Sequence, residues 1–334
     1  MDVVRVAVIG AGSWGTTVAS LAAQNAPTML WARRAEVAAE IDRDKCNGRY
    51  LPDFALSENL RASSEMCDVV ADADVVVMGV PSHGFRATLL EVAPHVRPLV
   101  PIVSLAKGLE QRSNLRMTEV VADVLPGHPA GVLTGPNLSK EILAGHAAAA
   151  VIAMTDDTLA ERLQRVFSTE HYRVYTNDDV TGCEIAGALK NVIAVAAGIA
   201  AGLGTGDNTL ASLLTRGLSE LTRLGVAMGG RPDTFAGLAG MGDLVATCIS
   251  SQSRNRYVGL QLAAGRHIDD IVAEMRQIAE GVKSVAVARE LALRYDVEMP
   301  ITDEMYEVIV HGRSATDAYR GLMRRKLGRE VRSA

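Results

Sequence analysis

The chain has 334 residues, of which 48% are hydrophobic and 22% are charged, with a net charge of -5. This length is sufficient for two domains, the composition is typical of a soluble globular protein, and the acidic balance gives no sign of nucleic-acid binding. The longest apolar stretch, Val192 to Leu203, is too short to span a bilayer, so no membrane span is expected.

The cysteines indicate a reducing compartment. Cys46, Cys67, Cys183 and Cys248 lie far apart and form no C-x-x-C pair, so neither a disulfide framework nor a zinc site is expected. No basic segment precedes the first apolar run, as a signal peptide would require. We therefore expect a cytoplasmic protein that uses no metal.

The amino-terminal residues predict a dinucleotide site. Val3 to Ile9 is a nearly continuous apolar run, as expected of a buried parallel strand, and Thr16 to Gln24 is expected to be helical. Between them, Gly10, Gly12 and Gly15 form G-x-G-x-x-G. Gly10 would permit the tight turn, Gly12 the approach of a pyrophosphate and Gly15 the packing of helix on strand. The free N–H groups at the helix start would bind the anion.

The second strand, Thr28 to Trp31, predicts which dinucleotide is preferred. It leads to Arg33 and Arg34, where an NAD site usually carries an acidic residue. Two guanidinium groups would attract a 2′-phosphate, which favours NADP(H) and leaves NAD(H) possible. Alternatively, the arginines lie at a solvated helix start with Glu36 as a local partner.

Further strands are predicted at Asp74 to Val80, Val100 to Leu105, Gly131 to Leu133, Ala148 to Met154 and Tyr172 to Tyr175. The alternation of strands and helices predicts a doubly wound, mostly parallel sheet over residues 1–179. Ligands bind beyond the carboxyl ends of such strands, so Lys107, after the strand at Val100 to Leu105, is expected in the crevice. It could equally be a solvated lysine at a strand end.

After Asp179 the pattern becomes helical, and residues 180–334 are predicted to form an all-helical substrate domain. Lys190 lies near its start, inside an apolar run rich in alanine and glycine. A buried lysine that loses its hydration can act as a general acid or base. The alternative is a lysine whose ammonium reaches the surface. A cleft between the two domains would bring Lys107 and Lys190 together.

Two polar segments of the second domain are candidates for the same site. Gly237 to Gly242 is rich in glycine and precedes Asp243, whose carboxylate could orient Lys190 or merely cap the next helix. The sequence Ser253-Arg254-Asn255 offers a hydroxyl, a guanidinium and an amide, which suit a phosphate at a helix start. It could also be only a polar loop.

These motifs, in this order, resemble the bacterial NAD(P)-dependent glycerol-3-phosphate dehydrogenases over nearly the whole chain. The segments that carry the resemblance are Gly10 to Thr16, Ser104 to Glu110, Gly135 to Asn137, Ala188 to Asn191, Gly240 to Leu244, Ser253 to Asn255 and Glu280 to Val282. The resemblance implies that dihydroxyacetone phosphate and sn-glycerol 3-phosphate interconvert by hydride transfer with NAD(P)H. It also implies a supply of glycerol 3-phosphate to glycerophospholipid synthesis.

The resemblance implies roles for individual residues. Lys190 would be the proton acceptor, with Lys107 and Asp243 also in the catalytic set. The substrate would contact Lys107, Gly135, Asn137, Lys190, Asn191, Asp243, Thr247, Ser253, Arg254 and Asn255. The cofactor would contact Gly10, Gly12, Ser13, Trp14, Gly15, Arg33, Arg34, Lys107, Ser139, Arg254, Ile278 and Glu280.

The sequence departs from the family pattern at Asn137 and Leu138, where many members carry serine or threonine and then phenylalanine. A Rossmann β-hydroxyacid or ketopantoate-type reductase would share the fold but act on a carboxylate and need no phosphate clamp. A non-catalytic NADP-sensing module would need neither Lys190 nor Asp243. The apolar helical half makes a homodimer the expected assembly.

Overall fold

The structure is a computed structural model that describes residues 4–275 and 279–324. By packing, the chain divides into two compact units. The first unit contains the residues up to Ala188 together with Leu221–Ala246, and the second contains Leu189–Glu220 together with the residues from Thr247 onward. The units interleave along the chain, whereas the sequence suggests a single boundary near Asp179. The division into domains at 1–179 and 180–334 therefore remains a prediction.

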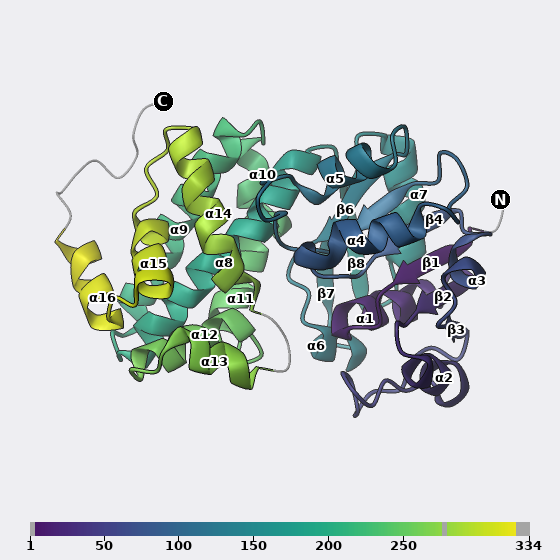
Figure 1. Cartoon of the computed structure of the whole chain (residues 1–334), viewed down its shortest axis with the longest axis horizontal. Coiled ribbons are helices and arrows are strands. Elements are labelled where there is room, and N and C mark those ends of the chain that lie inside the picture. The colour runs from purple at the N-terminus through teal and green to yellow at the C-terminus, as the bar shows by residue number, and fades with distance from the viewer. Residues whose placement is uncertain (1–3, 276–278, 325–334) are drawn as a thin grey trace. The chain divides into compact units, whose positions relative to one another are not determined.

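The first unit is built on an eight-stranded sheet with the strand order β3-β2-β1-β4-β5-β6-β7-β8 (Figure 1). The strands are β1 Val6–Ile9, β2 Thr28–Trp31, β3 Leu60–Ser63, β4 Val75–Met78, β5 Ile102–Ser104, β6 Ala130–Thr134, β7 Ala148–Ala153 and β8 Tyr172–Asn177. Neighbouring strands are parallel from β3 to β6 and again between β7 and β8, and only the β6–β7 pair is antiparallel. This order confirms the predicted Rossmann-type sheet.

The sheet has a hydrophobic core on each face because its strands alternate their side chains. Val6 and Val8 of β1 belong to one buried cluster, and Ala7 and Ile9 belong to the other. The helices of this part are α1 Ser13–Ala22, α2 Ala35–Asp44, α3 Met66–Val70, α4 Ser82–Val92, α5 Met117–Val124, α6 Ser139–Leu143 and α7 Asp157–Phe167.

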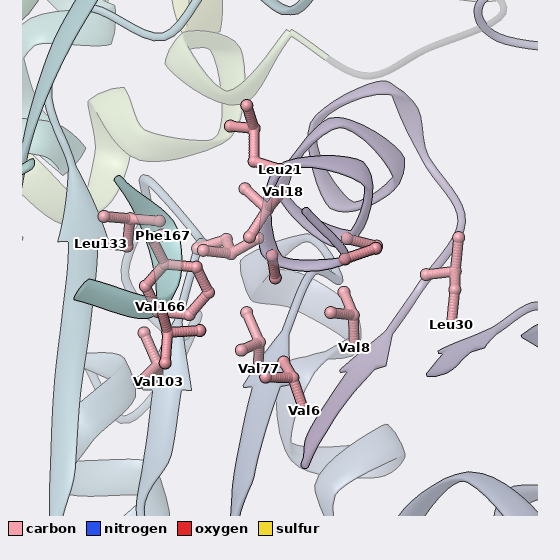
Figure 2. Packing of buried hydrophobic residues seen from close by; sticks show 14 of the residues in the cluster. Val6, Val8, Val18, Leu21, Leu30, Val77, Val103, Leu133, Val166 and Phe167 are labelled. Atoms are coloured by element: carbon pink, nitrogen blue, oxygen red, sulfur yellow. The ribbon is translucent and has the colours of Figure 1, made fainter. Parts of the chain in front are cut away.

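Figure 2 shows the first of these clusters, in which α1 and α7 pack on the central strands. Val18 and Leu21 of α1 lie over β1 and β4, and Phe167 at the end of α7 is fully buried. The second cluster receives residues from α3, α4 and α5. A fully buried side chain of this size contributes about 1.5–3 kcal/mol relative to exposure, so the two clusters dominate the stability of the sheet.

Element boundaries differ from those predicted by up to three residues. The second strand, Thr28–Trp31, is as predicted, but α1 begins at Ser13 rather than at Thr16. Trp14 and Gly15 therefore belong to the first helical turn. The strand β3 was not predicted, because Leu60–Ser63 has one apolar side chain large enough to signal a strand.

After β8, the described residues form helices and connecting loops, which confirms the predicted change of pattern. The elements are α8 Val180–Gly202, α9 Asp207–Ala227, α10 Pro232–Ala236, η1 Leu238–Gly242, α11 Asp243–Ile249, α12 Arg254–Ala263, α13 Ile268–Glu274, α14 Glu280–Arg294, α15 Pro300–His311 and α16 Ala315–Met323. The label η1 denotes one turn of π-helix.

The start of α8 is held by the carboxylate of Asp179. Its Oδ1 accepts a hydrogen bond from the backbone N–H of Gly182 at 2.8 Å. Its Oδ2 accepts from the N–H of Arg231 and from the hydroxyl of Thr234, both at 2.7 Å. One buried side chain thus caps α8 and also fixes the loop that leads into α10.

A second carboxylate, Glu184, ties α8 to α5. It accepts hydrogen bonds from the backbone N–H and the hydroxyl of Thr118 and from a guanidinium N–H of Arg116, the last at 2.8 Å. Burial raises the pKa of the Glu184 carboxyl, although the cation of Arg116 and the bonds from Thr118 act in the opposite direction. The polar tie stabilises the helix pair because each buried group is satisfied by another.

The apolar character of α8 reflects a position in the protein core. By length and composition this helix could cross a bilayer, but 89% of its apolar window is buried inside the folded chain. The apolar stretch judged too short from the sequence is thus part of a longer helix, Val180–Gly202. Among the described residues no other helix is long and apolar enough to be a candidate span.

Candidate active site

The glycine-rich loop lies between β1 and α1, as the sequence predicts. Gly10 has φ +113°, and a Cβ on it would lie 2.8 Å from the carbonyl oxygen of Gly79 at the end of β4. A Cβ on Gly15 would lie 2.1 Å from the carbonyl oxygen of Gly10. Packing therefore requires glycine at both positions, because backbone atoms occupy the space of a side chain.

Gly12 differs from its two neighbours in the motif. A Cβ on Gly12 would meet no atom of the described chain within 4 Å, so packing does not require glycine there. The close approach of a pyrophosphate would require it. Gly12 is the residue that precedes α1, and Ser13 opens that helix. The loop thus fits a dinucleotide at the amino end of α1.

Asn47 supports this loop from a distant part of the sequence. Its side chain is fully buried, and its Nδ2 donates to the carbonyl oxygen of Ala11 at 3.0 Å and to the hydroxyl of Thr16 at 2.9 Å. No sequence pattern indicates this role, because Asn47 lies in an irregular segment after α2.

Arg33 and Arg34 are exposed at the carboxyl end of β2, where a ribose would be expected. Arg34 has extended backbone torsions and precedes the first residue of α2. Among the described residues no salt bridge to either guanidinium is found, including the alternative with Glu36. Both side chains are therefore accessible to an anion from solvent.

Lys107 is a partly buried cation at the carboxyl end of the sheet. Its Nζ donates to the carbonyl oxygen of Gly135 at 2.7 Å and lies 2.8 Å from Oδ2 of Asp243. The side chains of Lys107 and Asp243 are 15% and 3% exposed, so the ion pair is shielded from solvent. Its burial contradicts the alternative of a solvated lysine at a strand end.

Asp243 is positioned by the glycine-rich segment before it. The turn of π-helix, Leu238–Gly242, ends where α11 begins at Asp243. A Cβ on Gly240 would lie 2.1 Å from the carbonyl oxygen of Phe235, so this close approach requires glycine. Asp243 is the first residue of α11 and pairs with Lys107, so its role goes beyond capping.

The loop after β6 holds buried polar groups. Gly135 has φ +125°, which favours glycine. Asn137 follows it, and its Oδ1 accepts a hydrogen bond from the hydroxyl of Tyr172 at 3.0 Å. The Nδ2 of Asn137 and the Oγ1 of Thr134 are buried without a hydrogen-bond partner among the described residues. Such groups are rare unless a ligand or water satisfies them.

Lys190 and Thr247 are two polar residues of the second unit that are joined by a hydrogen bond. Lys190 is 4% exposed, which contradicts the alternative in which its charge reaches the surface. Its Nζ donates a hydrogen bond to the hydroxyl of Thr247. The surrounding residues of α8 are buried and apolar, so the hydroxyl fixes the amine in an environment of low polarity.

Two asparagines of the second unit are joined through their amides. Asn255 donates from Nδ2 to Oδ1 of Asn191 at 2.8 Å, and its own Oδ1 accepts from the N–H of Gly281 at 2.9 Å. A Cβ on Gly281 would lie 2.5 Å from the carbonyl oxygen of Asn191, so α14 can approach α8 only through a glycine. This network fixes the orientation of both amides.

Arg254 is the first residue of α12, and its side chain is exposed in the single chain. Partial desolvation by neighbouring protein atoms lowers the pKa of its guanidinium, and the nearby carboxylate of Glu280 acts in the opposite direction. Ser253 caps the helix by accepting the N–H of Arg256 at 3.2 Å. An accessible guanidinium beside a helix start suits a phosphate dianion.

For the remaining predicted cofactor contacts, the structure gives a position in an element for two residues. Ser139 is the first residue of α6, and Glu280 is the first residue of α14. Ile278 lies outside the described residues. The predicted approach of Asp243 to Lys190 joins residues of different units, and it remains a prediction.

A cavity of about 330 Å³ in the first unit contains none of the predicted site residues. It is lined by Val151, Asn177, Arg231, Asp233, Thr234, Gly237, Leu238 and Ala239. Three of its polar side chains already have partners, since Arg231 pairs with Asp178 and contacts Asn177, and Thr234 donates to Asp179. The cavity thus borders Arg231 and Thr234, the residues that Asp179 binds at the start of α10.

Comparison with known proteins identifies the family. The family model "NAD-dependent glycerol-3-phosphate dehydrogenase N-terminus" matches residues 5–160 of this chain. The model "NAD-dependent glycerol-3-phosphate dehydrogenase C-terminus" matches residues 179–320. Curated relatives include glycerol-3-phosphate dehydrogenase (NAD(P)+) 2 of Sphingopyxis alaskensis, 56% identical over 98% of each chain. The enzyme of the same name from Mycobacterium avium is 56% identical over 98% of this chain and 96% of its own.

Solved structures agree with this assignment. The crystal structure of glycerol-3-phosphate dehydrogenase from Coxiella burnetii superposes with a TM-score of 0.91 at 34% identity, covering 97% of this chain and 99% of its own. A ketopantoate reductase from Ralstonia eutropha has a TM-score of 0.60 at 16% identity, covering 94% and 99%, and shares the fold alone. The chain belongs to the NAD-dependent glycerol-3-phosphate dehydrogenase family.

Proposed function

We propose that the protein interconverts dihydroxyacetone phosphate and sn-glycerol 3-phosphate, with NADP(H) as the favoured cofactor and NAD(H) as a possible one. The observation that carries this proposal is Lys190, a buried amine fixed by Thr247 within an apolar helix of a chain from this family. The names of the curated relatives specify the same substrate and NAD(P)+.

The glycine-rich loop and the start of α1 would hold the dinucleotide. Gly10, Gly12 and Gly15 keep the backbone close, and the N–H groups that begin at Ser13 would donate to the pyrophosphate. When bound, the nicotinamide supplies or accepts the hydride. Arg33 and Arg34 would attract the 2′-phosphate of NADP(H), and Trp14, Ser139, Ile278 and Glu280 are assigned to the remaining cofactor contacts.

Lys190 would move the proton. It would accept the proton of the C2 hydroxyl when glycerol 3-phosphate is oxidised and donate one to the C2 oxygen when the ketone is reduced. Its hydrogen bond to Thr247 would keep the amine in a single orientation during the transfer. Positive charge near this oxygen would stabilise the alkoxide character that develops on it.

The paired side chains of Lys107 and Asp243 are assigned to the same catalytic set. The carboxylate neutralises the lysine in a partly buried position, and the carbonyl oxygen of Gly135 accepts a hydrogen bond from its Nζ. The ammonium of Lys107 would then donate a further hydrogen bond to a hydroxyl or carbonyl oxygen of the substrate. The orientation of Lys107 is therefore set before substrate arrives, which lowers the entropy lost on binding.

Arg254, Ser253 and Asn255 would bind the phosphate. The guanidinium is accessible at the start of α12, where a phosphate dianion would pair with it and with the backbone N–H groups of the helix start. Asn191 orients the amide of Asn255. Binding energy from this remote group would align the reacting carbon with the cofactor. A carboxylated substrate would lack the phosphate contacts.

The direct test follows the absorbance of NADPH mixed with dihydroxyacetone phosphate, with NADH and a 2-ketoacid as parallel arms. Oxidation with the phosphorylated ketone and not with the ketoacid is expected, and it should be faster with NADPH than with NADH. Oxidation with the ketoacid alone would overturn the substrate assignment. Binding of NADPH without oxidation of either mixture would favour a sensing module.

We further infer that the protein is a cytoplasmic homodimer that supplies glycerol 3-phosphate for glycerophospholipid synthesis. The support for a dimer is α9, which leaves Leu210, Leu213 and Leu214 half-buried in the single chain. Such apolar area on a helix favours association with a second copy. Light scattering over a range of concentrations would measure the mass, and a monomer throughout would contradict the inference.

A further inference from the structure

Tyr172 is a buried phenol at the first position of β8. It is 1% exposed, and its ring packs edge-on against Trp14 of α1 with 6.3 Å between ring centroids. Its hydroxyl donates to Oδ1 of Asn137 at 3.0 Å. The ring and the hydroxyl therefore have separate partners, one on the cofactor side of the sheet and one in the loop after β6.

The phenol is a hydrogen-bond donor because it is neutral. Burial raises the pKa of Tyr172 well above its ordinary value of 10.0, and the carboxylate of Asp243 raises it further. A neutral buried hydroxyl must place its single proton on an acceptor, since leaving it unpaired is costly. The amide oxygen of Asn137 is that acceptor.

This bond decides which end of the Asn137 amide is available. An asparagine carries an acceptor oxygen and a donor NH₂ group, and it can present either one after a flip about its last torsion. Because Tyr172 occupies Oδ1, the NH₂ group is the end that remains. Nδ2 is buried without a partner among the described residues, and so is Oγ1 of Thr134 three residues earlier.

The loop and its neighbours form one polar cluster in the first unit. The carbonyl oxygen of Gly135 binds Lys107. A Cβ built on Gly187 would lie 3.1 Å from Oγ1 of Thr134 and 3.8 Å from Cγ of Lys107, so this hydroxyl and this lysine flank the same point of α8. The hydroxyl of Thr134 and the carbonyl of Gly135 therefore lie beside Lys107, in the same loop that carries Asn137.

We propose that Tyr172 is a positioning residue, which holds the Asn137 amide so that Nδ2 donates to an uncharged oxygen, hydroxyl or carbonyl, of the substrate. Tyr172 itself does not touch the substrate in this arrangement. The inference rests on the proposed function, because it assumes that Asn137 contacts a phosphorylated three-carbon substrate. This arrangement explains how Asn137 can bind the substrate at a position where many members of the family carry serine or threonine.

The kinetic test uses Tyr172→Phe, which keeps the ring against Trp14 and removes only the hydroxyl. KM for dihydroxyacetone phosphate should rise about 5- to 30-fold, as for the loss of one oriented hydrogen bond. Because Lys190 is untouched, kcat should change much less, and the affinity for NADPH should not change. Tyr175→Phe, on the exposed part of the same strand, is the matched control and should leave KM unaltered.

A double-mutant cycle separates positioning from packing. Asn137→Ala should raise KM, and adding Tyr172→Phe to it should produce little further change, because the hydroxyl would have nothing left to orient. Multiplying effects in the double variant would overturn the proposal. So would an unchanged KM in Tyr172→Phe accompanied by a lower melting temperature, which would mark the hydroxyl as a purely structural group.

A second measurement does not depend on turnover. In protein labelled with ¹⁵N-asparagine, the NH₂ signals of Asn137, assigned by their loss in Asn137→Ala, should shift or broaden in Tyr172→Phe and stay unchanged in Tyr175→Phe. Identical signals in Tyr172→Phe and the wild type would overturn the positioning role. If the wild type fails to oxidise NADPH with dihydroxyacetone phosphate, the proposed function fails, while the NMR result still decides whether Tyr172 orients the amide.

Discussion

The hydrogen bond between Lys190 and Thr247 is the feature at residue scale from which the chemistry follows. A lysine side chain has several rotatable bonds, and a buried hydroxyl partner restricts it to one direction. In the proposed mechanism the amine is thereby oriented for proton transfer before substrate binds. Its role in the reaction can be separated from its role in packing by a substitution of similar volume.

Lys190→Met should reduce kcat by about 10²- to 10⁴-fold, the usual contribution of a positioned acid or base. Methionine fills the same apolar space, so the affinity for NADPH, measured by fluorescence titration, should stay within about twofold. Lys283→Met, at a half-buried lysine of α14 without an assigned role, is the control. Retained turnover in Lys190→Met would remove the lysine from the mechanism.

Arg34 provides a test of cofactor choice. Arg34→Asp replaces an exposed guanidinium at the start of α2 by a carboxylate, which would repel a 2′-phosphate and accept a ribose hydroxyl. The ratio of kcat/KM for NADPH to that for NADH should fall by at least about tenfold. Arg43→Asp, at the other end of the same helix, should leave the ratio unchanged. An unmoved ratio in Arg34→Asp would refute the 2′-phosphate assignment.

At the scale of elements, α8 is held at its start by two carboxylates, Asp179 and Glu184. The first satisfies free N–H groups of helix starts, and the second forms a buried polar network with α5. No sequence pattern indicates the contacts that join each carboxylate to residues more than 50 positions away, Arg231 and Thr234 for Asp179 and Thr118 for Glu184. Local patterns report on local structure, and these contacts depend on the tertiary fold.

Glu184→Ala should lower the free energy of unfolding by about 1–3 kcal/mol, because it removes the buried acceptor of Arg116 and Thr118 and leaves the guanidinium with only Glu119 among its two carboxylate partners. Urea titration followed by circular dichroism would measure the change. Asp44→Asn, which breaks an exposed ion pair with Arg43, is the matched control and should have no measurable effect. Equal stability of Glu184→Ala and the wild type would show that the network contributes nothing.

The sequence predicts elements well where a single face is strongly apolar. The buried strands Val75–Met78 and Ala148–Ala153 were located because their side chains are apolar almost throughout. Leu60–Ser63 was missed, because as an edge strand it carries polar side chains. The start of α1 was placed three residues late, because glycine and serine carry little hydrophobic signal.

The candidate site divides in the same way. Glycine spacing locates the loop after β1, and the lysine within an apolar run draws attention to Lys190. Tyr172 and Asn47 gave no signal, because each acts on a loop that is distant in sequence. Thr134, directly before Gly135 at the end of β6, could have been noticed from its position alone.

At the scale of the whole molecule, buried acids that keep their protons in the fold, such as the phenol of Tyr172 and the thiol of Cys183, are expected to limit the alkaline range of stability. The pKa of Tyr172 is raised above the 10.0 of an unfolded tyrosine, chiefly by burial. Above about pH 10 the unfolded chain therefore releases a proton that the folded protein retains. The free energy of unfolding therefore falls as pH rises, by at most about 1.4 kcal/mol per pH unit for this group.

Tyr172→Phe should remove that contribution, so its free energy of unfolding should fall less steeply than that of the wild type between about pH 9 and pH 11. Urea titrations at a series of pH values would give the two slopes. Tyr175→Phe removes an exposed phenol, and its free energy of unfolding should depend on pH as that of the wild type does. Parallel slopes for Tyr172→Phe and the wild type would show that another group governs the alkaline limit.

The ion pair of Lys107 and Asp243 also bears on how the protein could be dissected or recombined. Its two members are 136 positions apart, yet both belong to the first unit, because Leu221–Ala246 returns to that unit after the chain has entered the second. A fragment cut at a single junction would lose the carboxylate that compensates the lysine. Chimaeras that exchange cofactor-binding halves among relatives would therefore need at least two further crossovers, flanking Leu221–Ala246, to inherit a charge-balanced loop.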